Sequence, residues 1–485
     1  MPDIKEILSN NDFDQAVSTL CVDEIEDRDT REYYNEYNGE RRRRKTSVGW
    51  REPKRLEVYS DTLTDKTGAP LRLPDKVVDV ARVVTNFPKK EVRTSVAFLF
   101  GGRMSITASD QNDGFLEFKR VWERKLKMQS VLKCFARKVL SESKAALLFF
   151  PYISQSADGS KVAELKVRIL SVPKREGVQS EFYPHFNDMD DMDAFTHKYQ
   201  VSVSGKLCQG VTIWTAGRII QATLQNGQWV TNEQVNPFGK IPVVYADVYR
   251  PEWDDVAGLM DAREMRLSRM IDTNDYNADP ILKTFDVYDL PNKDNVGKEI
   301  SFSSKVNPET NETYHGDAEY LTWSGSQPSV DKELEETKNE MYSGSSTPDL
   351  SFDNLKGIGN LSGVARRFML MDAMIKASDH METFGPVVTR CVSVVTAGIS
   401  NITNIKYAQQ LKGNLIDVEF GSILPDDLSE TMQVLQMANG GKPVNSQRTI
   451  TAQSPYTDDL EEELRLLEEE EKASAERNSM IGVTF

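Results

Sequence analysis

Apolar residues recur at helical spacing in three stretches of the chain. Between residues 115 and 143 they fall three and four positions apart, which predicts one or two amphipathic core helices. Similar stripes predict helices over about 251–276 and, as the longest, from 364 to 399, and residues 329–343 are expected to form a highly charged helix. Gly385-Pro386 lies inside the last stretch and is expected to kink or break it, because proline removes a helix hydrogen bond.

Alternating and β-branched runs fill the region between residues 145 and 245. They predict a largely antiparallel β-region, with Asp158-Gly159 and Asn226-Gly227 as turns. The expected strands are Ala146–Tyr152, Val162–Leu170, His197–Val203, Val211–Thr215, Gly217–Thr223 and Trp229–Val230.

Residues 278–330 form an insert between two predicted helices. Its strand-like pieces are Ile281–Tyr288, Lys298–Phe302 and Ala318–Trp323, separated by Asn, Gly and Pro. Nearer the N-terminus, residues 77–84 are flanked by two proline-containing segments, Leu71-Arg72-Leu73-Pro74 and Asn86-Phe87-Pro88, which are expected to separate secondary-structure elements. A helix or strand over 92–100 then ends at Gly101-Gly102.

Composition limits the class of protein. The chain has 485 residues, enough for two to four folding units, and 39% of them are hydrophobic, which indicates an ordered, soluble protein. Its apolar runs are shorter than the roughly 18 residues that span a bilayer, and residues 1–14 lack an apolar signal core, so neither membrane insertion nor secretion is expected.

Charge argues against tight binding of a phosphate backbone. The chain carries 75 acidic and 59 basic residues, a formal net charge of -16, whereas such binding needs clustered Lys and Arg. The run Arg41–Lys45 is the exception, and a solvated rim is favoured over nucleic-acid binding there, because no aromatic or Gly-rich context accompanies it. The acidic net charge does not exclude a protein that nucleic acid slides past without binding tightly.

Motifs for catalysis are weak. The glycines of residues 357–363 are spaced G-x-G-x-x-x-G without a preceding buried strand, so a loop that caps the next helix is favoured over a nucleotide site. The acidic cluster at Asp188, Asp190, Asp191 and Asp193 lacks the glycine and bidentate Glu of a calcium loop, so a solvated turn is favoured over a cation site. Four cysteines and four histidines stand far apart, without metal-ligand spacing. We therefore expect no enzyme activity, no metal and no cofactor.

The order of several short motifs resembles the portal proteins of long-tailed bacteriophages over most of the chain. The similar blocks are Asn86-Phe87, Val92-Arg93-Thr94, Leu99–Ile106, Asn236–Val243, the helix from Trp253 with Leu267, Ile271, Asp272 and Tyr276, Thr347-Pro348-Asp349, Ser362–Ala365, Lys376-Ala377 and the acidic stretch Asp458–Leu464. Thr347-Pro348-Asp349 followed by Ser362–Ala365 is the most specific of them. None is catalytic, and their order carries the resemblance.

The resemblance implies an α+β portal fold that forms a ring, usually of twelve subunits, at one capsid vertex. The expected regions are a wing (1–250), a stem helix (251–277), a clip (278–330), a second stem helix (331–343), a channel loop (344–363), a long kinked helix with a wing return (364–423) and a crown with an acidic C-terminal helix (424–485). A non-portal virion adaptor and a DNA-processing enzyme are the alternatives.

The same resemblance implies the partners and the location. Double-stranded DNA would pass through the channel during packaging and ejection. A terminase motor, a head-completion or adaptor protein, and the major capsid and scaffolding proteins would bind the ring, which would be assembled in the host cytoplasm and carried in the virion.

One loop is expected to touch DNA at the narrowest part of the channel. Gly357 and Gly359 permit backbone conformations closed to other residues, and Lys356 offers a single phosphate contact that is too weak to hold a duplex. The expected loop comprises Asp353, Asn354, Leu355, Lys356, Gly357, Ile358, Gly359, Asn360, Leu361 and Ser362. The alternative is an ordinary linker at the start of the following helix.

Overall fold

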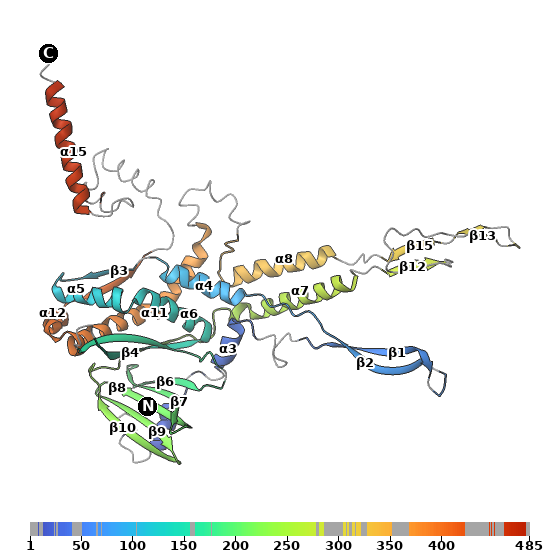
Figure 1. Ribbon diagram of the computed structural model, residues 1–485, viewed down its shortest axis with the longest axis horizontal. Helices are drawn as coiled ribbons and strands as arrows, with labels where there is room; N and C mark the ends of the chain where they lie inside the picture. The colour runs from blue at the N-terminus through green and yellow to red at the C-terminus, as the bar shows by residue number, and fades with distance from the viewer. Residues whose placement is uncertain are drawn as a thin grey trace. The chain divides into compact units, whose positions relative to one another are not determined.

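Helices and antiparallel strands share the described part of the chain, which confirms the expected α+β class (Figure 1). The computed structural model describes residues 13–40, 51–277, 281–285, 304–321, 327–351, 368–421 and 460–481, with short gaps inside several of these ranges and a few isolated positions outside them. The chain divides into two units: residues 1–359 with 368–423, and residues 360–367 with 424–485.

A group of packed helices forms the larger unit's centre. Its members are α4 (Phe87–Phe100), α5 (Asp113–Arg120), the π-helical turn η2 (Val121–Lys125), α6 (Met128–Glu142) and α11 (Met371–Gly398). The apolar stripe at 115–143 thus belongs to two helices joined by a π-helical turn, which is one of the two outcomes that the spacing predicted. Asn112 starts α5 because its side-chain oxygen accepts the Phe115 N–H at 2.9 Å. Lys127 and Ser143 bound α6 with positive φ angles of 52° and 64°.

Two antiparallel sheets account for the predicted β-region. One has the order β11-β4-β5 and the other β10-β9-β8-β7-β6. Their strands are β4 (Lys144–Gln155), β5 (Lys161–Leu170), β6 (Ser180–Phe186), β7 (Met192–Val203), β8 (Lys206–Thr215), β9 (Arg218–Gln225), β10 (Gln228–Val235) and β11 (Val243–Asp247). The predicted turn at Asn226-Gly227 is confirmed, with φ angles of 52° and 81°. Strand β6 was not expected, because its sequence SEFYPHF contains a proline and lacks regular alternation.

Smaller elements complete the larger unit. Helix α2 (Phe13–Leu20) packs Ala16, Val17 and Leu20 against the five-stranded sheet. The other elements are α3 (Thr30–Tyr37), β3 (Met104–Ala108), η5 (Ile399–Thr403), η6 (Ile405–Tyr407), α12 (Ala408–Lys412) and β16 (Ile416–Phe420). Strand β16 pairs antiparallel with β3, so the chain beyond α11 returns to the N-terminal half.

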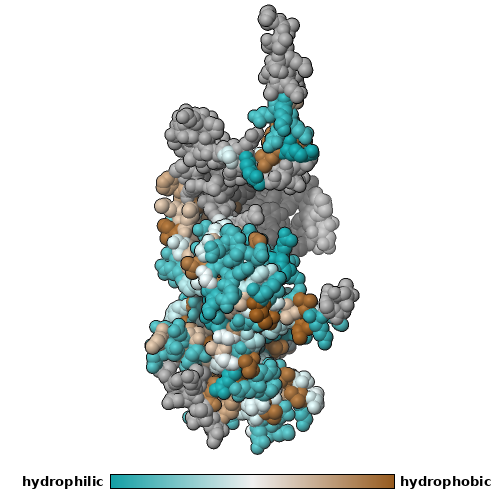
Figure 2. Space-filling view, turned by 90° about the vertical axis from the view of Figure 1, so that its left-hand side faces the viewer, coloured by the Kyte–Doolittle hydropathy of each residue, from teal (hydrophilic) through white to brown (hydrophobic). Residues whose placement is uncertain are grey.

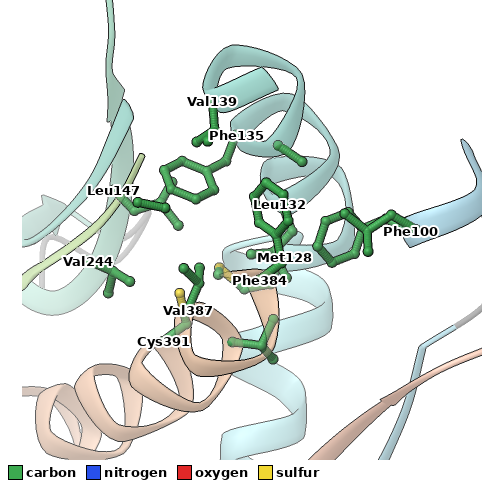
Figure 3. Close-up of a cluster of buried hydrophobic side chains, with 14 of the residues drawn as sticks. Phe100, Met128, Leu132, Phe135, Val139, Leu147, Val244, Phe384, Val387 and Cys391 are labelled. Carbon is green, nitrogen blue, oxygen red and sulfur yellow. The ribbon is translucent and has the colours of Figure 1, made fainter. Parts of the chain in front are cut away.

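The hydrophobic core lies between α4, α6, α11 and the three-stranded sheet. Figure 3 shows Phe100, Leu132, Phe135 and Phe384 converging from three different helices. The ring of Phe384 lies 5.7 Å from that of Phe100 and 6.3 Å from that of Phe135, both edge-on. Such edge-to-face packing adds to the stabilisation from burial alone.

Pro386 does not break the long helix. Helix α11 continues through it from Met371 to Gly398, so the part of the expectation that allowed a break is wrong. Met371–Thr403 is also long and apolar enough to cross a membrane by length and composition. Its buried side chains include Phe384, Val388 and Val395, which belong to the core, and this accounts for its apolar sequence.

The predicted insert lies between two long helices. It is preceded by η3 (Asp254–Val256) with α7 (Ala257–Asn277) and followed by α8 (Gln327–Gly344), and these two helices pack side by side (Figure 1). They run antiparallel, since Arg266 pairs with Glu333 at 2.6 Å while Gly344 lies against Val256. Inside the insert β12 (Ile281–Phe285) pairs with β15 (Asp317–Leu321), and β13 (Ser304–Val306) pairs with β14 (Thr313–His315). The expected strand Lys298–Phe302 lies outside the described residues.

An antiparallel β-hairpin precedes the helical core. Strand β1 (Lys54–Thr64) pairs with β2 (Pro70–Val78), and this hairpin was not expected. Residues Leu71–Pro74, taken above as a break between elements, lie inside β2, so that interpretation is wrong. Proline is tolerated there because this two-stranded sheet leaves each strand with an unpaired edge.

The described surface is mainly polar. On the face drawn in Figure 2, hydrophilic residues predominate among the coloured atoms, and hydrophobic residues form small patches between them. In the smaller unit, the described helix α15 (Leu460–Ile481) confirms the predicted acidic C-terminal helix, with Leu464 and Leu467 half-buried.

Truncating a core leucine tests this packing. Leu132 of α6 is fully buried, so Leu132→Ala is expected to lower the free energy of unfolding by about 2–5 kcal/mol, through lost burial and the cavity left behind. Leu116 of α5 is 57% exposed, so Leu116→Ala is the matched control and should cost less than about 0.5 kcal/mol. Urea unfolding followed by circular dichroism measures both, and equal losses would contradict the placement of the core.

Candidate functional site

The structure describes the chain on both sides of the expected channel loop. Residues 353–362 themselves lie outside the described residues. The N-terminal flank is the segment 345–351 that follows α8, and the C-terminal flank is the start of α11. The candidate site is therefore defined by how these two flanks are held.

Lys376 of α11 holds the C-terminal flank through three buried contacts. Its Nζ lies 2.7 Å from Glu252 Oε1 and 3.0 Å from Glu91 Oε1, and it donates to the backbone carbonyl of Ser345 at 2.7 Å. Glu91 belongs to α4, Glu252 lies two residues before η3, which leads into α7, and Ser345 directly follows α8. One ammonium group thus joins α11 to α4 and to one end of each of the two long helices.

Glu252 is the anionic centre of this cluster. It also accepts hydrogen bonds from Ser95 Oγ at 2.6 Å and from His380 Nε2 at 2.9 Å. Burial alone would raise the pKa of Glu252, but the His380 hydrogen bond and the Lys376 charge outweigh it and hold the pKa at about 2. Glu252 is therefore ionised at neutral pH.

Glu91 behaves in the opposite way. Its burial raises the pKa of the carboxyl group to about 8, and the nearby Lys376 charge offsets only part of this effect. Its second oxygen, Oε2, is buried and has no hydrogen-bond partner among the described residues. Since Lys376 already pairs with Glu252, Glu91 is mainly protonated at neutral pH.

Asp349 holds the N-terminal flank. Its carboxylate lies 2.7 Å from Lys338 Nζ of α8 and 3.0 Å from Lys90 Nζ of α4. Burial would raise the pKa of Asp349, but the hydrogen bonds from the two lysines lower it to about 2. Lys90 also donates to the Tyr342 hydroxyl. The contacts of Asp349 with Lys90 and Lys338 give the Thr347-Pro348-Asp349 motif a structural role.

These two side-chain contacts, which we call the clamps, therefore involve consecutive residues of α4. Lys90 holds Asp349, before the loop, and Glu91 holds Lys376, after it. The chain from 349 to 376 begins and ends against the same turn of α4, and residues 353–362 lie within that closed stretch.

A second polar contact runs along α7. Glu264 accepts the Thr85 N–H at 2.7 Å, Ser268 accepts the Val83 N–H at 2.9 Å, and Asp272 accepts the Ala81 N–H at 2.8 Å. Four helical residues rise about 6 Å, close to the roughly 6.6 Å that separates alternate N–H groups of an extended chain, so the two series match. We call this series the α7 ladder.

The α7 ladder was missed from the sequence. The apolar stripe predicted on this helix is buried at Trp253, Val256 and Met260, but beyond them the buried positions are the polar Glu264 and Ser268. The sequence did contain a signal for it: Glu264, Ser268 and Asp272 follow one another at intervals of four residues, which places all three on one helix face.

Helix α11 carries exposed apolar side chains on the face opposite its clamp. The buried Ala373 and Lys376, three positions apart, lie on the same side of the helix and mark its inward face, so the opposite side faces outwards. The exposed residues there and just before the helix are Phe368, Met369, Met371, Met374 and Ile375. We call this group the α11 outer face. Exposed apolar side chains that cluster in this way are typical of an interaction surface.

The remaining sequence candidates show no shared site. Among the described residues no three His, Cys, Asp or Glu side chains are placed to hold a metal ion, and within the acidic turn Asp193 instead pairs with His185 at 2.6 Å. Of the other histidines, His380 joins Glu252, and His197 meets the Ser180 hydroxyl at 3.0 Å. The Arg41–Lys45 run and the glycines at 357–363 lie outside the described residues.

Buried polar contacts thus hold α4, α8 and α11 together with Glu252. The family model for phage portal proteins of the SPP1 Gp6-like type matches residues 29–477, nearly the whole chain. The chain belongs to this family. Among curated proteins none matches the chain.

Membership of this family establishes the general function of the protein. This is a phage portal protein, a structural protein of the bacteriophage capsid vertex that serves DNA packaging. The family implies an oligomeric ring that associates with DNA, with the capsid and with the terminase. The resemblance inferred from the order of motifs is confirmed.

The two carboxyl groups beside Lys376 should respond to pH with opposite signs. The folded pKa of Glu91 is raised from 4.5 to about 8, so its contribution to stability is lost as the pH rises through that window. Glu91→Gln should therefore gain stability over the wild type between about pH 5 and about pH 8, by up to about 1.4 kcal/mol per pH unit.

Glu252→Gln is the matched comparison, measured by urea unfolding of both variants across the pH range. The folded pKa of Glu252 is lowered to about 2, so its contribution is present above 4.5 and is lost as the pH falls towards 2. This variant should lose about 3–5 kcal/mol at neutral pH, because Lys376 is left without its main counter-charge. Two variants with the same pH profile would contradict the assigned charge states.

Proposed function

We propose that the chain closes into a ring of twelve subunits around an axial channel for double-stranded DNA. The ring would admit DNA during packaging and release it during ejection, after assembly in the host cytoplasm and incorporation into the virion. The observation that carries the proposal is the family match over residues 29–477, which includes every described long helix except the end of α15.

The stem and clip are assigned to the two long helices and their insert. Residues 251–277 and 331–343 would form the stem, and residues 278–330 the clip that binds the terminase motor and later a head-completion or adaptor protein. In support, α7 and α8 pack antiparallel and the described insert strands pair as β12–β15 and β13–β14. A β-hairpin at the end of a helix pair offers strand edges for pairing with another chain.

The wing and crown are assigned to the rest of the chain. Residues 1–250 and 364–423 would form the wing, which would contact the major capsid and scaffolding proteins, and residues 424–485 the crown. The separate compact unit that contains residues 424–485 supports this division. The acidic α15 would present to packaged DNA a surface that repels it.

The channel loop is assigned to residues 353–362, within the region 344–363. Its support is the pair of clamps: Asp349 and Lys376 hold the flanking chain against Lys90 and Glu91, so a loop between them has a fixed base. Gly357 and Gly359 give that loop a freely adaptable backbone, and Lys356 gives it one phosphate contact. A fixed base with an adaptable tip suits contact with a moving duplex.

Ring closure is the first test. The purified protein should form particles with an open axial channel in negative-stain images and with twelve times the protomer mass of 54.8 kDa in native mass spectrometry. We place the α11 outer face at the contact between subunits, so Met371→Glu combined with Ile375→Glu should leave the protomer folded by circular dichroism and shift the particles to smaller species. A stable wild-type monomer at micromolar concentration would contradict the proposal.

Channel-loop variants separate assembly from DNA passage. Lys356→Glu, and Gly357→Val combined with Gly359→Val, should preserve the ring but lower the yield of packaged DNA severalfold, because they add repulsion or stiffen the backbone. Packaging is measured as nuclease-protected DNA, with Lys412→Glu as the charge-matched control on α12. Wild-type packaging by the loop variants would leave residues 353–362 as an ordinary linker.

A further inference from the structure

A cavity of about 490 Å³ lies at the start of helix α6. Its walls come from strand β3, from the π-helical turn η2 and from the first two turns of α6. The volume falls in the range of pockets that hold small molecules. Apolar side chains, among them Met104, Ile106 and Met128, form part of the lining, so the polar groups beside them decide what the cavity can bind.

Trp122 brings an unpaired hydrogen-bond donor to this cavity. The residue is 1% exposed and lines the cavity, and its indole Nε1 is buried without a hydrogen-bond partner among the described residues. Buried indole N–H groups usually find an acceptor. Because an indole nitrogen only donates, the partner that Trp122 lacks is an acceptor.

The first turn of α6 adds further donors. Lys127, at the N-cap position, has a left-handed backbone with a φ of 52°, and no side chain caps the helix. Ser130 and Val131 donate their N–H groups to the Lys127 carbonyl. The N–H groups of Met128 and Gln129 come before them and have no acceptor within the helix. These groups, together with the positive end of the helix dipole, favour an anion.

Two ammonium groups line the same cavity. Lys127 and Lys133 form no ion pair with any described residue, whereas the nearby Lys125 pairs with Glu164 at 2.6 Å. The acidic side chain among the described lining residues is that of Glu123, which is exposed. Two lysines against one carboxylate give the lining a net charge of +1. The cavity therefore combines uncompensated positive charge with donors that lack acceptors.

The surrounding helices strengthen the attraction for an anion. Residues 119–138, all of them described, contain eight basic residues and one acidic residue, a net charge of +7 in a chain whose total is -16. A doubly charged phosphate group with several acceptor oxygens suits two ammonium groups and several N–H donors better than a single carboxylate does. A phosphate inside a DNA backbone carries one charge and has a sugar on each side. The deeply buried Trp122 donor therefore favours a free or terminal phosphate.

We propose that the cavity at the start of α6 binds a phosphate group, either as inorganic phosphate or as the terminal phosphate of a small ester such as a nucleoside monophosphate. Lys127 and Lys133 neutralise its charge, while Trp122 Nε1 and the first N–H groups of α6 donate to its oxygens. The site belongs to a single chain and does not depend on the proposed ring. A ligand that binds only the folded chain also stabilises it.

Equilibrium dialysis of the full chain against radiolabelled inorganic phosphate, at constant ionic strength, tests the site. The wild type should bind one phosphate per chain. Lys127→Gln combined with Lys133→Gln should weaken binding at least tenfold, because both ammonium groups are lost. Lys119→Gln combined with Lys174→Gln is the charge-matched control at two exposed lysines outside the cavity, and should change the affinity less than twofold. Circular dichroism checks that each variant is folded.

Two further measurements separate a built site from diffuse attraction. Trp122→Phe keeps an aromatic ring but removes the Nε1 donor, and should weaken phosphate binding at least fivefold. Phosphate should raise the Tm of the wild type and of the lysine control, but not that of the variant lacking Lys127 and Lys133. If Trp122→Phe does not fold, the lysine variants still decide between the two cases.

Competition for the labelled phosphate distinguishes the two sources. Displacement by deoxyadenosine monophosphate at a concentration at least tenfold lower than by unlabelled phosphate would assign the site to an ester, and the reverse order would assign it to free phosphate. An absence of saturable binding up to about 10 mM phosphate, or equal losses in the two double-lysine variants, would overturn the proposal. So would displacement by hexaglutamate at lower concentrations than by either phosphate compound, since the cavity would then serve a protein carboxylate.

Discussion

The constraint on which the structure depends is the attachment of two distant segments to adjacent residues of α4. Lys90 binds Asp349 and Glu91 binds Lys376, so the polypeptide between them is a loop closed at its base. Both contacts are buried or half-buried: Asp349 is ionised between two lysines, whereas Glu91, mainly protonated at neutral pH, accepts a hydrogen bond from the Lys376 ammonium group. Such contacts contribute more to the specificity of an arrangement than to net stability, and the arrangement specified here is the base of the loop proposed to line the channel.

The same cluster sets where the long helices begin and end. Glu252, which precedes α7, and Ser345, which follows α8, are both held by Lys376. A displacement of α11 would therefore change the contacts of both long helices, and the α7 ladder would carry the change to the base of the β1–β2 hairpin. Helices α7, α8 and α11 and the base of the hairpin are thus linked through hydrogen bonds and ion pairs.

The short motifs from which the resemblance was inferred have structural roles in this chain. Asn236 donates from Nδ2 to the carbonyls of Thr215 and Lys240, and so fixes the turn that brings buried Phe238 under the sheet. Gly239 has a φ of 67°, which favours glycine. Asp349 and Lys376 are the clamps of the loop. Each residue acts through a local hydrogen bond or a tight turn, which explains why the motifs are short and why their order carries the identification.

The sequence by itself determined the α+β class, the core helices over 115–143, most strands between 145 and 245, and the pair of helices around the insert. These features follow from local periodicity, which depends only on neighbouring residues. Tertiary structure decided which polar side chains are buried: those of Glu91, Glu252, Glu264 and Ser268 read as surface positions until their partners, up to hundreds of residues away, are placed beside them. It also decided that Leu71–Pro74 is a strand and that Pro386 leaves α11 unbroken. Hydrogen bonds and packing between distant segments are not encoded in spacing, so only the folded chain reveals the loop's fixed base.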